Sequence, residues 1–118
     1  MHEMSVMGEI FSILDDHIKE HKLNKISKIV LRVGEMTCIN PKALDFAFQI
    51  FAEGTLAEGG ELIVKRVEAR ARCNCCGRLF KISYLNRLCP HCQTYSDQLV
   101  NGYELLLDEV EGEIDEGC

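Results

Sequence analysis

The chain has 118 residues, of which 47% are hydrophobic and 27% are charged. This length allows one hydrophobic core with a small insert but is short for two ordinary domains. The 13 Lys and Arg residues against 19 Asp and Glu residues give a net charge of −6. This balance excludes a protein built as a whole to coat nucleic acid or an anionic membrane.

The cysteine content points to metal binding in a reducing compartment. Seven cysteines are an odd number, which fits a fully disulfide-paired secreted scaffold poorly. No apolar stretch approaches the roughly 18 consecutive residues of a membrane span, and acidic residues interrupt the N-terminal sequence where a signal peptide has a continuous apolar run. We therefore expect a cytoplasmic protein whose closely spaced cysteines are ligands rather than disulfides.

The first predicted elements are a helix and a strand. An amphipathic helix is expected from Met4 to about His21, because apolar residues recur there at helical spacing: Met4, Met7, Ile10, Phe11, Leu14 and Ile18. Residues 25–33 then alternate, which predicts a strand that ends at Gly34 and buries one main face: Ile29, Leu31 and Val33.

A second helix and two more strands follow. Asn40 and Pro41 are typical of an N-cap and a first helical residue, and the apolar side of this helix continues to a glycine stop at Gly54: Leu44, Ala47, Phe48 and Phe51. Residues 61–67 and 103–110 alternate again, so two strands bracket the segment 69–101.

Charge is unevenly distributed along this framework. Residues 69–96 carry five basic residues and no acid, whereas residues 104–118 carry seven acids and no base. The pattern indicates a basic insert in an acidic α+β body, with an acidic tail that frays after Val110.

The insert contains two CxxC pairs, which are the strongest signal in the sequence. Cys73 and Cys76 are followed by Gly77, and twelve residues separate Cys76 from the pair Cys89 and Cys92. Each pair places two sulfurs on one tight turn, and the two turns can face each other as the four-thiolate shell that zinc prefers.

Other cysteines and one histidine are alternative zinc ligands. Cys75 could replace Cys73 or Cys76, but only those two reproduce the CxxC-Gly arrangement. His91 could compete for a ligand position, yet four thiolates already complete a closed shell, and we also take Cys38 and Cys118 as non-ligands. A closed shell favours a structural zinc over a catalytic one, and its binding can supply on the order of 10 kcal/mol to fold so small a segment.

The first three residues form a second candidate site. The Met1 amine with the amide and imidazole nitrogens of His2 can chelate one ion, and Glu3 can complete the set. Such nitrogen-rich planar donors suit Ni(II) or Cu(II), although a histidine at position 2 is more often an idle terminal residue. His17 and His21 could also bind a metal, but we favour imidazolium groups placed at the negative end of the first helix.

Taken together, these residues resemble the HypA/HybF family of nickel metallochaperones for [NiFe]-hydrogenase maturation. The resemblance is carried in order by the opening MHEMS, by VGEMTCINPKALDFAF at residues 33–48, by the CxxCG and CPxC pairs, and by the closing strand. It implies an α+β fold of two helices on a three-stranded sheet, with a small zinc domain inserted between the second and third strands.

The resemblance also implies domains, ligands and partners. Residues 1–68 with 102–112 would form the nickel-binding domain and residues 69–101 the zinc domain, with 113–118 as an acidic tail. Nickel would be held by His2, the Met1 amine and Glu3, and zinc by the four cysteines of the two pairs. The implied partners are the GTPase HypB and the hydrogenase large-subunit precursor, and a homodimer is compatible with the resemblance.

Three positions depart from the family pattern. Cys75 adds a third thiol to the first cysteine pair. Asn40 stands where some relatives have an aspartate near nickel, and Gln93 stands where a glycine usually follows the second cysteine pair.

The leading hypothesis is therefore a non-enzymatic nickel carrier with no nucleic-acid or membrane partner. A zinc-ribbon module that binds nucleic acid or docks on a protein is the main alternative, motivated by the basic insert, whose charge we assign to an acidic protein partner. A redox switch at Cys75 and Cys118 is a third hypothesis with less support, since adjacent cysteines form strained disulfides.

Overall fold

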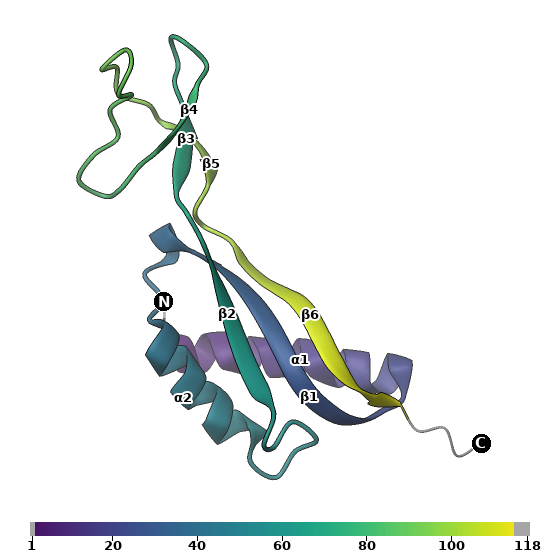
Figure 1. Cartoon of the computed structure of the whole chain (residues 1–118). Helices are drawn as coiled ribbons and strands as arrows, with labels where there is room; N and C mark the ends of the chain where they lie inside the picture. The colour runs from purple at the N-terminus through teal and green to yellow at the C-terminus, as the bar shows by residue number, and fades with distance from the viewer. Residues whose placement is uncertain (1, 115–118) are drawn as a thin grey trace. The chain divides into compact units, whose positions relative to one another are not determined.

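The computed structural model describes residues 2–114; Met1 and residues 115–118, with Cys118 and most of the expected tail, lie outside the described residues. The elements follow in this order (Figure 1): α1 (Glu3–His21), β1 (Leu23–Gly34), a 3-10 helix η1 (Glu35–Thr37), α2 (Pro41–Ala52), β2 (Glu61–Val67), β3 (Arg70–Arg72), β4 (Leu79–Lys81), β5 (Gln98–Asn101) and β6 (Leu105–Ile114). Across these residues, no helix is long and apolar enough to span a membrane.

The strands form two three-stranded sheets. The first has the order β2-β1-β6, and Figure 1 shows α1 crossing these strands. The second has the order β4-β3-β5 and comes from the segment between β2 and β6. The predicted α+β class, with a four-cysteine insert between the second and third strands of the main sheet, is confirmed.

The described residues divide into two compact units. The helix unit contains the described parts of 1–31, 39–65 and 106–118, and the cysteine unit contains 32–38 and 66–105.

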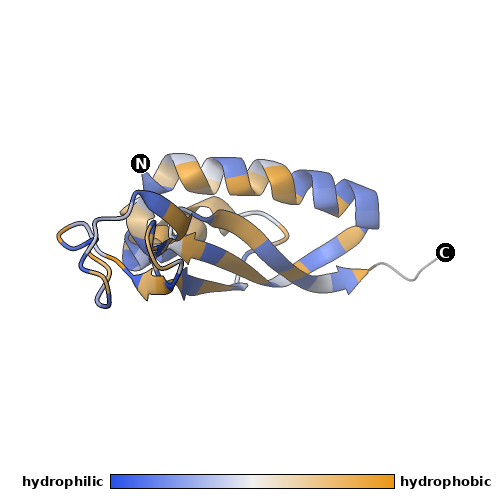
Figure 2. Ribbon diagram, turned by 90° about the horizontal axis from the view of Figure 1, so that it is seen from above, coloured by the Kyte–Doolittle hydropathy of each residue, from blue (hydrophilic) through white to orange (hydrophobic). Residues whose placement is uncertain are grey.

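The core of the helix unit lies between α1, α2 and the main sheet. From α1 it buries Val6, Met7, Ile10 and Leu14, and from α2 Leu44, Ala47, Phe48 and Ala52. The Phe11 ring joins the helices, with its centroid 5.9 Å from that of Phe48 and 5.6 Å from that of Phe51. Figure 2 shows α1 with apolar and polar positions on different sides.

The predicted apolar face of α1 needs one correction at its start. Met4 is 45% exposed, whereas Val6 is buried. Val6, Ile10 and Leu14 are spaced four residues apart, so they form one row along the helix. The buried stripe follows this row, and Met4 falls beside it.

The caps of α2 agree with the sequence prediction. The Asn40 side chain accepts hydrogen bonds from the backbone N–H of Lys42 at 2.9 Å and of Ala43 at 3.2 Å, and Pro41 occupies the first turn. The helix ends at Ala52, just before Gly54, whose positive φ of 77° suits glycine.

Strand β6 continues into the segment expected to fray. It extends to Ile114, four residues beyond Val110. Lys28 of β1 pairs with Glu111 at 3.0 Å, and the Ser27 hydroxyl donates to the Glu111 carbonyl oxygen at 3.0 Å. Pairing with β1 therefore orders an acidic stretch that composition alone marks as tail.

Two glycines allow a close backbone approach inside the cysteine unit. The Gly34 and Met36 N–H groups donate to the carbonyl oxygens of Glu104 (2.8 Å) and Gly102 (2.7 Å). A Cβ on Gly34 would lie 2.1 Å from the Gly102 oxygen, and one on Gly102 would lie 2.9 Å from the Ala69 Cβ. The start and the end of the insert are thus in direct contact.

Replacement of Phe48 by alanine tests the core of the helix unit. Phe48 is fully buried, and Phe46 on the same helix is 67% exposed. We expect Phe48→Ala to lower the free energy of unfolding by about 3–5 kcal/mol through lost burial and a cavity, and Phe46→Ala to change it by less than about 0.5 kcal/mol. Denaturant unfolding followed by helical circular dichroism measures both, and equal losses would contradict this core.

Candidate metal centres

The cysteine unit is built from short strands and a small core. Strand β3 pairs antiparallel with β4 and β5, with an irregularity between Arg70 and Ala71. Its buried core contains mainly small side chains and sulfur: Met36, Ala69, Ala71, Cys73, Phe80, Ile82 and Cys89. Such a core buries little apolar surface, so the fold of this unit needs another source of stability.

Four cysteine sulfurs meet at one point in this unit. The Sγ atoms of Cys73, Cys76, Cys89 and Cys92 all lie within 4.8 Å of one another. The Sγ atoms of Cys76 and Cys89 are 3.8 Å apart. Zn–S bonds of about 2.3 Å in a tetrahedron place neighbouring sulfurs about 3.8 Å apart, so this donor set fits a tetrahedral zinc.

Two turns of the same design present these sulfurs. The Gly77 N–H donates to the Cys73 carbonyl oxygen at 3.1 Å, and the Gln93 N–H donates to that of Cys89 at 2.7 Å. In each turn the N–H of the second cysteine, Cys76 or Cys92, points at the first sulfur at 3.4 Å.

The residue that closes each turn has a left-handed backbone. Gly77 has φ 75° and Gln93 has φ 56°. The second turn therefore keeps the glycine conformation with a side chain in place, at a cost of roughly 1–2 kcal/mol. Both turns thus close with a left-handed residue, although the second has Gln93 in place of glycine.

The electrostatics of the cluster favour a bound cation. Hydrogen bonds from the Cys76 and Cys75 backbone N–H groups lower the pKa of the Cys73 thiol to about 6. The side chain of Cys76, together with burial, raises the pKa of the Cys92 thiol to about 12. Four sulfurs this close repel one another as thiolates, and a divalent cation at their centre offsets that repulsion.

Within residues 2–114, two other cysteines lie outside the cluster. Cys75 is exposed, and its backbone N–H donates to the Cys73 sulfur at 3.4 Å. Cys38 has a left-handed φ of 62°, and its Sγ lies 3.1 Å from the Tyr84 hydroxyl oxygen. That hydroxyl also donates to the Met36 carbonyl oxygen, so Cys38 belongs to a small polar contact that its sequence position did not indicate.

At the N-terminus, His2 is the N-cap of α1. Its carbonyl oxygen accepts from the Val6 N–H at 3.1 Å. Its side chain is exposed and makes no capping hydrogen bond with the described part of the chain. The Met1 amine lies outside the described residues.

Glu3 is fixed beside His2 by a contact that the sequence analysis missed. The Asn40 N–H donates to the Glu3 carboxylate at 3.1 Å, and this bond lowers the pKa of Glu3 below its usual value. Glu3 is thus an anion at neutral pH. The Asn40 side-chain oxygen caps α2, so Asn40 contributes to this end of the unit through its backbone and its cap.

A second group of donor atoms lies at the other end of α1. His17, Glu20 and His21 each offer one ligand atom within 4.8 Å of the others. The sequence analysis singled out both histidines but not Glu20.

Comparison with known proteins gives a consistent result. The family described as "Hydrogenase/urease nickel incorporation, metallochaperone, hypA" matches residues 1–112. A hydrogenase maturation factor HypA from Desulfitobacterium hafniense is 37% identical over 113 residues, covering 96% of this chain and 99% of that protein. The HypA of Aquifex aeolicus is 32% identical, with 98% of this chain and 100% of that protein covered.

One solved structure supports both the sequence relation and the fold. The solution structure of the Ni metallochaperone HypA from Helicobacter pylori has a TM-score of 0.68 at 25% identity, covering 98% of this chain and 100% of that one.

Asn40→Ala tests the cap that fixes the Glu3 end of the unit. Loss of two backbone hydrogen bonds should lower the free energy of unfolding by about 1 kcal/mol. Asn40→Ser keeps a capping oxygen, so its free energy of unfolding should lie within about 0.3 kcal/mol of that of the parent chain. Thermal and denaturant unfolding of both variants measure the difference, and equal stability of the two would show that the cap contributes nothing.

Proposed function

We propose that this chain, which belongs to the HypA family of nickel-incorporation metallochaperones, binds Ni(II) at its N-terminus and delivers it to a [NiFe]-hydrogenase large-subunit precursor. One observation carries the nickel site. His2 stands at the exposed N-cap of α1 with its imidazole outside the cap, and Glu3 beside it is held by the Asn40 N–H.

The proposed nickel ligands are the Met1 amine, the His2 amide and imidazole nitrogens, and Glu3. Nitrogen donors in this number suit Ni(II). The His2 amide nitrogen precedes the first intrahelical hydrogen bond, so using it as a ligand costs α1 none of its backbone bonds. The exposure of His2 supports transfer, because an acceptor's ligand can approach the ion directly.

We further propose that the ion of the four-cysteine cluster is zinc, with a structural role. The closed set of four thiolates and the sulfur spacing support this assignment. Bound there, zinc supplies cross-links that substitute for a larger core. The cysteine side chains hold the two turns against each other, and their backbone N–H groups stabilise the thiolate form.

The domain assignment and the partners are part of this proposal. Residues 1–68 with 102–112 form the nickel-binding domain, residues 69–101 form the zinc-binding domain, and residues 113–118 form an acidic tail. HypB and the hydrogenase precursor are the proposed partners, with a homodimer as a further proposed state. A cytoplasmic location is supported by the described cysteines, which are not paired in disulfides.

The nickel site is tested with untagged, zinc-loaded protein. We expect His2→Ala, or an extension of several residues before Met1, to weaken Ni(II) binding by roughly tenfold or more, equivalent to about 1.4 kcal/mol. The substitution removes the imidazole, and the extension moves the terminal amine out of reach of the chelate. His91→Ala is the matched histidine control and should leave the affinity unchanged. Isothermal titration calorimetry measures all three, and unchanged affinity in both N-terminal variants would refute the site.

The zinc site is tested by two neighbouring cysteines. Cys76→Ser should lose bound zinc and destabilise the cysteine unit, because one bond of the tetrahedron is removed. Cys75→Ser should keep one zinc per chain, since Cys75 lies outside the cluster. Metal analysis by mass spectrometry and unfolding in the presence of a chelator report both effects. Zinc retained in Cys76→Ser, or lost in Cys75→Ser, would reassign the ligands.

A further inference from the structure

The last turns of α1 place three metal-binding side chains together. His17, Glu20 and His21 occupy positions i, i+3 and i+4, which share one side of a helix. One ligand atom from each lies within 4.8 Å of the others. The two imidazole rings are nearly parallel, with an interplanar angle of 12° and centroids 5.8 Å apart.

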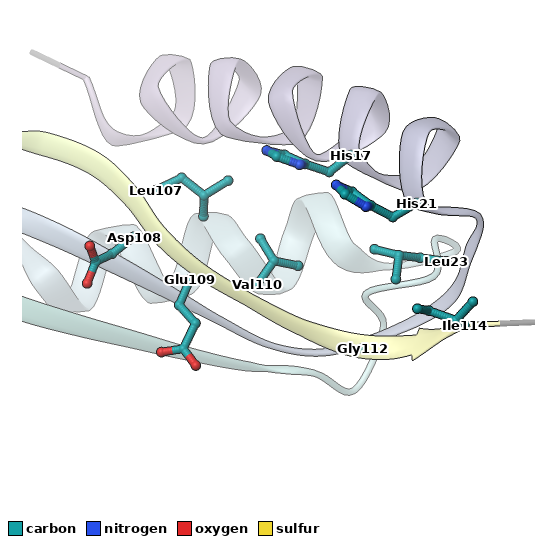
Figure 3. Close-up of a pocket in the computed structure, with 9 residues that line it drawn as sticks. All are labelled: His17, His21, Leu23, Leu107, Asp108, Glu109, Val110, Gly112 and Ile114. Atoms are coloured by element: carbon teal, nitrogen blue, oxygen red, sulfur yellow. The ribbon is translucent and has the colours of Figure 1, made fainter.

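The rings face a pocket of the helix unit. Figure 3 shows both imidazoles side by side between α1 and β6, above the side chains of Leu107 and Val110. The pocket has a volume of about 390 Å³, and its other lining residues include Asp108 and Glu109. Their carboxylates point away from the rings in Figure 3, so the nearby donor set is the helical group alone.

The backbone of α1 fixes this group in place. Lys22 closes the helix with a left-handed φ of 55°, and its N–H donates to the Ile18 carbonyl oxygen. Leu14, one turn before His17, is 1% exposed and anchors the helix. The negative end of the helix dipole also lies at this turn and favours a bound cation.

We propose that His17, His21 and Glu20 bind a divalent first-row transition ion at the C-terminal end of α1. Two imidazoles and one carboxylate are typical ligands of Ni(II), Zn(II) and Cu(II), whereas Mg(II) prefers oxygen ligands alone. The open pocket leaves room for water at the remaining positions. The ion would be held by neutral imidazole nitrogens, so its binding displaces protons from these rings.

This site goes beyond the proposed nickel carrier, because one ion cannot serve both ends of α1. His17 lies 15 positions after His2, or roughly 22 Å along a helix at 1.5 Å per residue. The two sites also differ in donors. The N-terminal site uses an amine and an amide nitrogen, and the helical site uses side chains only.

Equilibrium dialysis with Ni(II) tests the site in the untagged, zinc-loaded His2→Ala chain, from which the N-terminal site is removed. We expect this chain to bind one Ni(II), in addition to its zinc, at the helical site. His17→Ala or His21→Ala in this background should weaken Ni(II) binding by roughly tenfold or more. Loss of a residue that only hydrogen-bonds to a metal ligand already costs about tenfold in affinity, and each of these variants removes a ligand itself. His91→Ala in the same background should leave it unchanged, and circular dichroism confirms that the helices persist.

A second readout uses the imidazole resonances. Substoichiometric Ni(II) should broaden the His17 and His21 ring signals selectively in nuclear magnetic resonance spectra, and excess Mg(II) should not restore them. The proposal is overturned if the His2→Ala chain binds no further Ni(II), if both α1 variants bind as well as their parent, if the His91 signal broadens first, or if Mg(II) displaces the ion.

Discussion

The meeting of four cysteine sulfurs within 4.8 Å is the constraint on which the cysteine unit depends. Cys73 follows β3 directly, and its N–H donates to the Arg78 carbonyl oxygen just before β4. The first cysteine turn is therefore continuous with the paired strands β3 and β4. Because the surrounding core is made largely of alanine and cysteine, a distorted cluster leaves little else to keep these short strands in register.

The helix unit is stabilised by a different interaction, the burial of apolar side chains. Its fully buried side chains include Phe48, Met7 and Leu14, which interlock between two helices and a sheet. Burial of apolar area stabilises it, and this term is independent of thiol oxidation or chelation. The two units thus differ in what stabilises them: buried apolar area in the helix unit, and in the cysteine unit the four-sulfur cluster with its proposed metal.

Local sequence patterns predicted most of the fold and the four-cysteine cluster. Helical spacing, the Asn40 cap and the two CxxC pairs are short-range features, so the sequence displays them directly. The Lys28–Glu111 pair and the Asn40–Glu3 hydrogen bond join residues 83 and 37 positions apart. Such contacts depend on how the strands and helices fold back on one another, and neither periodicity nor composition reports them.

The glycine contact where the insert meets the rest of the chain limits which residues can stand there. Gly34, at the end of β1, and Ala69, where the insert begins, both lie so close to Gly102 that a Cβ on Gly34 or Gly102 would collide. A side chain at Gly34 or Gly102 would force these backbones apart. The junction fixes the separation of the two ends of the insert, and the cost of closing a loop between fixed ends changes only slowly with its length. A longer or shorter insert is therefore compatible with the same junction.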